Sequence, residues 1–335
     1  MKVAVVGAGA WGTTVASILA SRAETVIWAR EPEVVAAINE GHENPLFLPG
    51  ARLSPSLRAS LDPVEAVTGA GVVALAVPSE FYRNVLGDVG SAIAPHVPCL
   101  SLSKGIEVGS LKRMTEVAAE VLADHDADRI GVLSGPNIAR EVLAGHPAAT
   151  VVAMRDDKAR VDVQRLLMTD TLRVYTNSDV VGCEIGGAVK NVIAIAAGMA
   201  SGLGFGHNTL AALVTRGLAE LTRLGVALGG QPLTFLGLAG IGDLIVTCES
   251  SDSRNHHVGE ELGRGRSLAD NRAGMRSVAE GVRSCGAILA LARRVSIELP
   301  ICEQVGAVLD GHSQPQDAVV ALLHREAKPE LHGIG

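Results

Sequence analysis

The chain has few aromatic residues: Phe, Tyr and Trp together make up 2% of its 335 residues. Its cores must therefore be built from Ala, Val, Leu and Ile. It also lacks the cysteine pattern of a disulfide framework or a zinc site, because its five cysteines are odd in number, widely scattered and without a CxxC pair. This usage favours a reducing cytoplasm as the compartment.

A surplus of positive charge is absent as well. Asp and Glu number 36 against 29 Lys and Arg, for a formal net charge of −7, which argues against a nucleic-acid partner. The hydrophobic fraction of 47% excludes intrinsic disorder. The length predicts two domains, each large enough to bury its own core.

No secretory signal or membrane span is evident in the sequence. Residues 191–215 contain no Asp, Glu, Lys or Arg, but the apolar run at 192–200 is shorter than the ~20 residues that a span needs. Gly202, Gly204 and Gly206 follow, and they would expose polar backbone groups to lipid. We interpret the stretch as buried structure of a soluble protein.

Short apolar β-rich runs alternate with helical patterns over the first half of the chain, which is typical of βαβ units and a parallel sheet. From about residue 179 helical patterns dominate. The sequence predicts an α/β protein, with a doubly wound parallel sheet in residues 1–180 and an all-helical domain in residues 181–335. The expected strands are 2–6, 24–30, 72–77, 97–103, 130–133, 150–154 and 172–176, and the expected helices are 11–20, 31–39, 184–201, 209–228, 279–295 and 316–324.

Residues 7–12, GAGAWG, form a GxGxxG motif after the first expected strand and at the start of the first expected helix. Gly7 permits the tight turn, Gly9 lets the backbone approach a pyrophosphate, and Gly12 lets helix and strand pack closely. The helix N-terminus offers free N–H groups to the phosphates. This context predicts a dinucleotide site of the Rossmann type.

The end of the second strand is where such sites distinguish NAD from NADP. NAD sites usually place Asp or Glu there to bind the ribose 2′-hydroxyl, whereas Arg accommodates a 2′-phosphate. This chain has Arg30 at that point, followed by Glu31. We therefore expect NADP to be favoured, with dual use of NAD; the alternative for Arg30 is a solvated strand end.

Two lysines are candidates for the chemistry. Lys104 follows the strand LSLS, at the sheet edge where ligands bind in open α/β folds, although a surface lysine is the alternative. Lys190 interrupts an apolar, Gly- and Ala-rich helix. A buried lysine needs a partner and is suited to general acid–base catalysis; a lysine that snorkels from the helix edge is the alternative.

Polar residues near position 250 are candidates for binding an anion. Asp243 stands between a Gly-rich turn and an apolar run, as a partner for a buried cation would. Ser253, Arg254 and Asn255 supply hydroxyl, guanidinium and amide donors, and a guanidinium binds phosphate through two parallel hydrogen bonds. A helix starting near Ser253 adds further donors. The alternative is a polar loop that caps the next helix, and the sequence predicts no metal site.

A series of short motifs extends the pattern over nearly the whole chain. They are GAGAWGTTVA (7–16), NPLFLPG (44–50), AVPS (76–79), SKGIE (103–107), LSGPNIAREV (133–142), GGAVKNVIAIAAG (186–198), TRGLAELTRLG (215–225), GLAGIGDLIVTC (237–248), SRN (253–255) and AEGV (279–282). In this order they closely resemble the bacterial-type NAD(P)-dependent glycerol-3-phosphate dehydrogenases.

The resemblance implies a Rossmann domain and a helical domain similar to that of 6-phosphogluconate dehydrogenase. It implies reversible hydride transfer between sn-glycerol 3-phosphate and dihydroxyacetone phosphate, which feeds glycerophospholipid synthesis. Lys190 matches the family's proton acceptor, and Lys104 the lysine that touches substrate and nicotinamide. The matching substrate positions are Gly135, Asn137, Asp243, Ser253, Arg254 and Asn255, and the matching cofactor positions are Ala10, Trp11, Arg30, Ala139, Arg254, Val278 and Glu280.

One departure from the family concerns Asn137 and Ile138, because the family usually has Ser or Thr followed by Phe there. A backbone contact at this position would leave substrate affinity unchanged, whereas a hydroxyl contact would shift it. The expected partner is a small phosphate ester, with a homodimer as the candidate assembly.

Two other functions fit parts of the pattern. A β-hydroxyacid dehydrogenase shares the domain pair and a lysine on a helix, but it would need a carboxylate-binding site. A non-catalytic NADP(H) sensor would bind the dinucleotide, yet it leaves Lys104, Lys190 and Asp243 without a purpose.

Overall fold

The computed structural model describes residues 1–268, 279–327 and 329–330. It separates into two compact units. The first unit comprises Met1–Lys104 and Met114–Val180, and the second comprises Gly105–Arg113 and Val181–Gly335.

The first unit is built on a sheet of eight strands, in the order β10-β9-β8-β7-β6-β1-β2-β5. The six strands β5-β2-β1-β6-β7-β8 reproduce the strand order of a dinucleotide-binding Rossmann sheet, with the switch point between β1 and β6. The strands are β1 (Lys2–Val6), β2 (Glu24–Trp28), β5 (Leu57–Ser60), β6 (Val72–Leu75), β7 (Cys99–Ser101), β8 (Ile130–Ser134), β9 (Ala148–Ala153) and β10 (Leu172–Asn177).

The sheet is mostly parallel, in agreement with the expected doubly wound parallel sheet, and one pair of strands departs from this direction. β9 runs antiparallel to β8, and β10 runs parallel to β9. The apolar runs predicted these two strands but not their direction, because a strand buried on both faces carries no signal of direction. The sequence also missed β5 and a small hairpin of β3 (Glu43–Asn44) and β4 (Leu48–Arg52).

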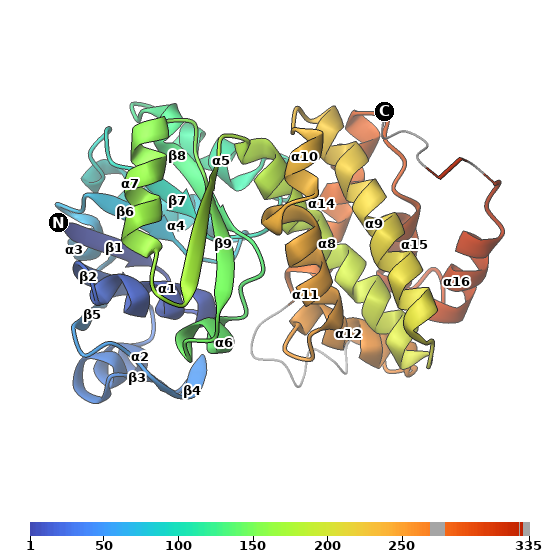
Figure 1. Ribbon diagram of the computed structural model, residues 1–335, viewed down its shortest axis with the longest axis horizontal. Coiled ribbons are helices and arrows are strands. Elements are labelled where there is room, and N and C mark those ends of the chain that lie inside the picture. The colour runs from blue at the N-terminus through green and yellow to red at the C-terminus, as the bar shows by residue number, and fades with distance from the viewer. Residues whose placement is uncertain (269–278, 328, 331–335) are drawn as a thin grey trace. The chain divides into compact units, whose positions relative to one another are not determined.

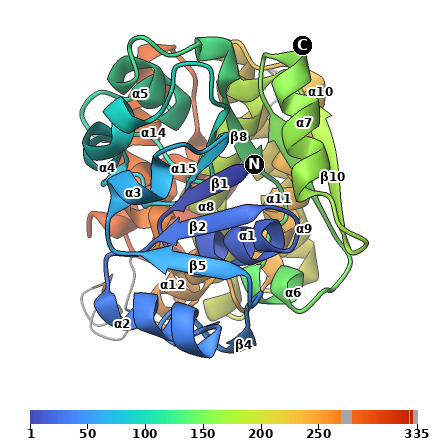
Figure 2. The ribbon, with the colours of Figure 1, turned by 90° about the vertical axis from the view of Figure 1, so that its left-hand side faces the viewer.

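Helices cover both faces of this sheet (Figure 2). Val3 and Val5 of β1 point to one face and Ala4 and Val6 to the other, as the pleat requires. The first face packs against α1 (Ala10–Ala20), α6 (Ala139–Leu143) and α7 (Asp157–Leu167), and the second against α3 (Pro63–Val67), α4 (Tyr82–Val89) and α5 (Met114–Val121). The expected helix at 31–39 is α2 (Pro32–Ala36) followed by a π-helical turn, Ala37–Gly41.

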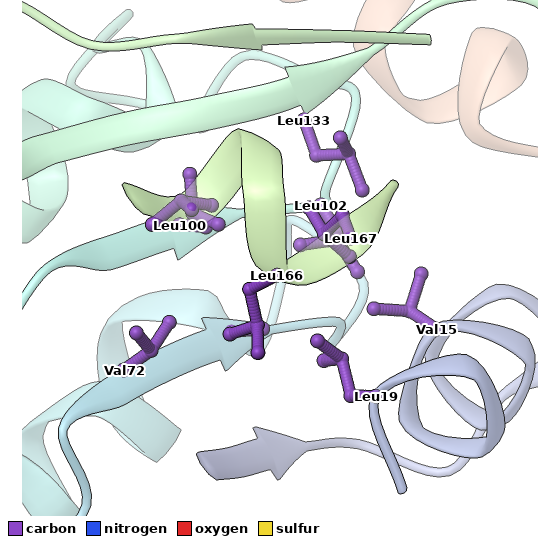
Figure 3. A pocket seen from close by; sticks show the side chains of 10 residues that line it. Val15, Leu19, Val72, Leu100, Leu102, Leu133, Leu166 and Leu167 are labelled. Carbon is purple, nitrogen blue, oxygen red and sulfur yellow. The ribbon is translucent and has the colours of Figure 1, made fainter. Parts of the chain in front are cut away.

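A small cavity lies between the sheet and helices α1 and α7 (Figure 3). Its volume is about 10 Å³, and its lining is wholly apolar, with Val15 and Leu19 of α1 and Leu167 of α7 among the side chains. A space of this size holds at most about one water, and apolar cavities stay dry. It is a packing gap rather than a ligand site.

The second unit is helical and is built around α8 (Val180–Gly202) (Figure 1). Among its described residues the other α-helices are α9 (His207–Ala227), α10 (Pro232–Phe235), α11 (Asp243–Glu249), α12 (Arg254–Gly263), α14 (Glu280–Arg294), α15 (Pro300–Leu309) and α16 (Pro315–Leu323). α8 and the stretch Pro232–Glu249 are long and apolar enough to cross a membrane by length and composition alone. In the structure 94% of the α8 window and 44% of the other window are buried. α8 is thus a core helix, which confirms the expected burial for residues 191–200. For the rest of the stretch 191–215 the expectation was wrong in part, because residues 204–208 are exposed.

Glycines bring the backbones of α8 and α12 into direct contact. A Cβ atom at Gly198 or Gly202 of α8 would collide with a carbonyl oxygen of α12, and a Cβ at Gly259 or Gly263 of α12 would collide with a carbonyl oxygen of α8. The four glycines therefore form a reciprocal contact in which each helix leaves room for the other. They fix the separation of the helix that carries Lys190 from the helix that begins at Arg254.

The segment Gly105–Arg113 belongs to the helical unit, which corrects the expected first domain of residues 1–180. Ile106 is 1% exposed within the helical core, and the partly buried Arg113 forms an ion pair with the buried Glu184 of α8. Short-range sequence patterns could not predict this assignment, since it depends on contacts between residues 71 positions apart.

Candidate active site

The three motif glycines occupy three different environments. Gly7 has φ +110°, and a Cβ there would lie 2.7 Å from the carbonyl oxygen of Ala76. A Cβ at Gly12 would collide with the carbonyl oxygen of Gly7. At Gly9 a Cβ would meet no atom of the described residues within 4 Å. The outer glycines are required for packing, and the middle one leaves the backbone open to a ligand.

The turn leads directly into α1, whose first residue is Ala10. The N–H groups of this first turn are unpaired within the helix, and they carry the positive end of its dipole. The indole nitrogen of Trp11 is enclosed and has no hydrogen-bond partner among the described residues. Buried indole N–H groups usually have a partner, so this orphaned donor fits a site completed by a ligand.

Arg30 follows β2 and is largely exposed. Its guanidinium pairs with the carboxylate of Glu31 at 2.9 Å, and 76% of the Arg30 side chain is accessible. An exposed pair of this kind contributes about 0–1 kcal/mol, so the guanidinium can exchange partners at small cost.

Lys104 lies just beyond β7 on the carboxyl side of the sheet, and its ammonium donates to the carbonyl oxygen of Gly135 at 3.1 Å. Gly135 follows β8 with φ +135°, a conformation that favours glycine. The first unit thus brings Lys104 and Gly135 together at the carboxyl edge of its sheet.

Asn137 is held by its amide group. The hydroxyl of Thr150 donates to the carbonyl oxygen of Ser134, so its oxygen accepts from the Asn137 amide nitrogen at 3.2 Å. The other amide atom, Oδ1 of Asn137, is buried without a partner among the described residues. Ala139, the first residue of α6, accepts a hydrogen bond from Thr14 of α1 at 3.1 Å. This bond connects α6 to the helix that follows the glycine turn.

In the helical unit Lys190 is buried, with 5% of the residue exposed. Its ammonium lies 3.0 Å from a carboxylate oxygen of Asp243, which is itself 1% exposed. A buried charge is tolerated when its partner is this close. The expected pairing of Lys190 with Asp243 is therefore present.

Thr247 completes this arrangement, and it was not among the residues expected from the sequence. Lys190 donates to its hydroxyl oxygen at 2.6 Å, and the hydroxyl donates to the backbone carbonyl of Asp243 at 2.6 Å. Asp243 and Thr247 stand one turn apart on α11, so one helix presents both partners of the lysine. The signal available was the spacing of four residues that places them on one face.

Ser253 caps α12, which begins at Arg254. This cap is the feature that the alternative of a polar capping loop predicts, and it also supplies the helix start on which the candidate anion site depends. The oxygen of Ser253 accepts from the backbone N–H of His256 at 3.2 Å. The side chain of Asn255 faces the interior, where it donates to Asn191 at 3.0 Å and accepts from the N–H of Gly281 at 2.9 Å. Its amide therefore connects α8, α12 and α14, and its backbone N–H remains in the first turn of α12.

Comparison with known proteins assigns the chain to a family. The N-terminal model of NAD-dependent glycerol-3-phosphate dehydrogenase matches residues 2–160, and the C-terminal model matches residues 179–320. The chain belongs to the NAD-dependent glycerol-3-phosphate dehydrogenase family.

Individual relatives match over almost their full length. A glycerol-3-phosphate dehydrogenase [NAD(P)+] from Sphingopyxis alaskensis is 50% identical over 99% of both chains, and one from Thermobifida fusca is 50% identical, again over 99% of both. The crystal structure of glycerol-3-phosphate dehydrogenase from Coxiella burnetii superposes with a TM-score of 0.91 at 34% identity and covers 97% of this chain and 99% of that one. The chain is accordingly an NAD(P)-dependent oxidoreductase.

The described part of this dehydrogenase contains no group of three or more His, Cys, Asp or Glu residues able to hold a metal ion. Its five cysteines are buried and free. Burial raises the pKa of Cys248 to about 12, although Lys190 lowers it in part. The Cys248 thiol therefore stays protonated at neutral pH and is not a nucleophile.

Two further expected cofactor positions, Val278 and Glu280, remain to be located. Glu280 is the first residue of α14, and Val278 lies outside the described residues. The glycine turn, the open space at Gly9 and the orphaned indole of Trp11 fit a dinucleotide.

Proposed function

We propose that the chain reduces the ketone of dihydroxyacetone phosphate to the alcohol of sn-glycerol 3-phosphate with NADPH or NADH, and that it also runs the reverse reaction. The observation that carries this proposal is the buried pair of Lys190 and Asp243. A buried lysine is costly, and a sensor that only binds nucleotide has no use for it. The names of the relatives supply the substrate.

The reduction needs a hydride at the ketone carbon and a proton at its oxygen. When bound in the first unit, a reduced nicotinamide would supply this hydride. As the C=O π electrons move to the oxygen, Lys190 donates a proton from its ammonium group and is left as a neutral amine, which regains a proton from solvent. Asp243 and Thr247 hold the ammonium in place, and in the reverse direction the neutral amine accepts the alcohol proton.

We assign Lys104 to charge stabilisation. Its ammonium, directed by the carbonyl of Gly135, would offset the negative charge that develops on the substrate oxygen. Gly135 and Asn137 are assigned to substrate contact, with the unpartnered Oδ1 of Asn137 as its acceptor atom. Because this oxygen only accepts, a substrate hydroxyl suits it, whereas the serine or threonine usual in the family can also donate.

The phosphate of the substrate is assigned to the start of α12. Arg254 offers a planar guanidinium, and Ser253 retains its hydroxyl proton because its cap uses only the oxygen as acceptor. Asn255 contributes its backbone N–H rather than its amide, which is engaged inside the unit. An anion at a helix N-terminus is favoured by the dipole, and a fixed phosphate orients the ketone.

The cofactor is assigned to the first unit, with contacts at Gly7, Gly9, Ala10, Trp11, Gly12, Arg30, Lys104 and Ala139, joined by Arg254, Val278 and Glu280 from the second. Arg30 favours NADPH, since a guanidinium suits the 2′-phosphate. We further propose a cytoplasmic homodimer that supplies glycerophospholipid synthesis.

One assay tests the proposal. The purified chain is mixed with dihydroxyacetone phosphate, and oxidation of NADPH or NADH is followed by the loss of absorbance of the reduced nicotinamide. We expect turnover with this substrate and none with 3-keto acids, which are the substrates of a β-hydroxyacid dehydrogenase. Dinucleotide binding without turnover would support the sensor function instead.

A further inference from the structure

Asn44, at the end of β3, is buried with 0% of the residue exposed. Its amide nitrogen donates to the carbonyl oxygen of Ala8 at 2.9 Å and to the hydroxyl oxygen of Thr13 at 2.9 Å. Its Oδ1 accepts from the backbone N–H of Phe47 at 3.2 Å. Partners on both sides therefore fix the orientation of the amide.

Thr13 of α1 acts on the same carbonyl. Its hydroxyl donates to the oxygen of Ala8 at 3.0 Å, and Thr13 is also 0% exposed. The carbonyl of Ala8 thus accepts two side-chain hydrogen bonds in a site shielded from water. Ala8 stands between Gly7 and Gly9, the two glycines of the motif that form the turn.

The orientation of this carbonyl determines the orientation of the next N–H. The peptide bond between Ala8 and Gly9 is trans, and in a trans peptide the C=O and the N–H point in opposite directions. With the carbonyl of Ala8 directed toward Asn44 and Thr13, the N–H of Gly9 points away from them. At Gly9 an added Cβ would meet no described atom within 4 Å, so the backbone there has an open side.

We propose that Asn44 is a positioning residue for the cofactor: it holds the peptide between Ala8 and Gly9 so that the N–H of Gly9 faces the pyrophosphate. This rests on the proposed function, because it assumes a dinucleotide at the glycine turn. Without Asn44 the peptide is less restrained, and a turned peptide would present its carbonyl oxygen to an anion. Asn44 lies on a hairpin outside the Rossmann sheet, so the hairpin stabilises the ligand-binding conformation of the turn.

The test is to measure the dinucleotide affinity of the Asn44→Ala variant. The Asn39→Ala variant is the matched control. Asn39 makes the same two types of bond, to the carbonyl and the N–H of Ala59, away from the turn. We expect Asn44→Ala to raise the Kd of NADPH, NADH and ADP-ribose by a similar factor of about ten, the equivalent of one hydrogen bond to a charged group. Competition by adenosine, which has no phosphate, should not change.

The kinetic signature separates positioning from a general loss of structure. Asn44→Ala should raise the KM for the cofactor while kcat at saturating cofactor stays within about twofold of the parent, because the proton donor is untouched. Asn39→Ala should leave cofactor Kd and KM unchanged. A Kd for Asn44→Ala within about twofold of that of Asn39→Ala would overturn the proposal.

A second pair of variants decides the matter if Asn44→Ala does not fold. Thr13→Val removes one donor to the Ala8 carbonyl and one acceptor of Asn44, whereas Thr13→Ser keeps both. We expect weaker NADPH binding in Thr13→Val and parental binding in Thr13→Ser; equal affinities in the two would refute the proposal. Failure of the parent chain to bind any dinucleotide would instead refute the proposed function.

Discussion

The ammonium of Lys190 donates to the hydroxyl of Thr247 at 2.6 Å, and the same hydroxyl donates to the backbone of Asp243. Thr247 therefore acts as an orienting contact for the proposed proton donor. We expect Thr247→Val to lower kcat by about tenfold or more while cofactor Kd stays constant, because one hydrogen bond of the lysine is lost. Thr247→Ser should restore kcat; equal rates in the Val and Ser variants would contradict this role.

Replacement of the lysine itself is the stronger test. Lys190→Ala should lower kcat by about 10²–10⁴-fold, the usual contribution of a general acid, while NADPH still binds. Steady-state rates and a fluorescence titration measure the two effects. Turnover close to that of the parent would end the assignment of Lys190 as proton donor.

Asp243→Asn should affect both stability and rate. It leaves the ammonium of Lys190 buried without its carboxylate, at a cost of about 3–5 kcal/mol in the free energy of unfolding. The double variant Lys190→Met with Asp243→Asn removes both charges and should recover most of that loss without recovering activity. Urea unfolding of the single and double variants measures the coupling, and additive losses would show that the pair contributes no stability.

Arg30 sets the cofactor preference in our proposal. Arg30→Ala should weaken NADPH binding by about tenfold, the loss of a charge-assisted contact to the 2′-phosphate, and leave NADH binding unchanged. Parallel titrations with both cofactors give the comparison. This role would be excluded if the parent bound NADPH no more tightly than NADH and if Arg30→Ala bound NADPH as tightly as the parent does.

The buried carboxyl of Glu220 should make the free energy of unfolding depend on pH. Its carboxylate accepts from the N–H groups of Ile301 and Cys302 at the start of α15, and burial raises its pKa from 4.5 to about 7, against the opposing effects of these bonds and of Arg223. Between these two values the native state binds a proton that the unfolded state has lost. The contribution of the Glu220 carboxyl to the free energy of unfolding is therefore fully present below about pH 4.5. It falls by up to about 3 kcal/mol as the pH rises toward 7.

The variant Glu220→Gln provides the comparison. It cannot titrate, so its free energy of unfolding should decrease less between about pH 5 and about pH 8 than that of the parent. Urea unfolding at several pH values measures how the free energy of unfolding of each protein changes with pH. The same change with pH in parent and variant would show that the Glu220 carboxyl does not titrate in this window.

The sequence predicted the fold where local patterns are strong. The run KVAVV matched β1 to the residue, and the GxGxxG motif gave the turn and the start of α1. Lys190 and Asp243 were paired correctly because a charge in an apolar helix requires a partner.

The features that were missed depend on distant residues. β5 lacks a clear strand pattern, and the direction of β9 depends on its connection rather than on its side chains. Asn44 stood in a recognised motif, but its contact with Ala8 spans 36 positions and appears only in the folded chain. The interior role of the Asn255 amide was hidden for the same reason, because its partner Asn191 is 64 positions away.

The segment Gly105–Arg113 has a consequence for dissecting the protein. A fragment that begins at residue 181 would omit Ile106, leaving a hole in the helical core, and would deprive the buried carboxylate of Glu184 of its partner Arg113. Such a fragment contains nearly all of α8 and the other described helices of the second unit, yet it lacks part of that unit's interior. The helical unit is therefore not a contiguous cassette, and any attempt to express it alone or to graft it onto another nucleotide-binding domain must carry those nine residues with it.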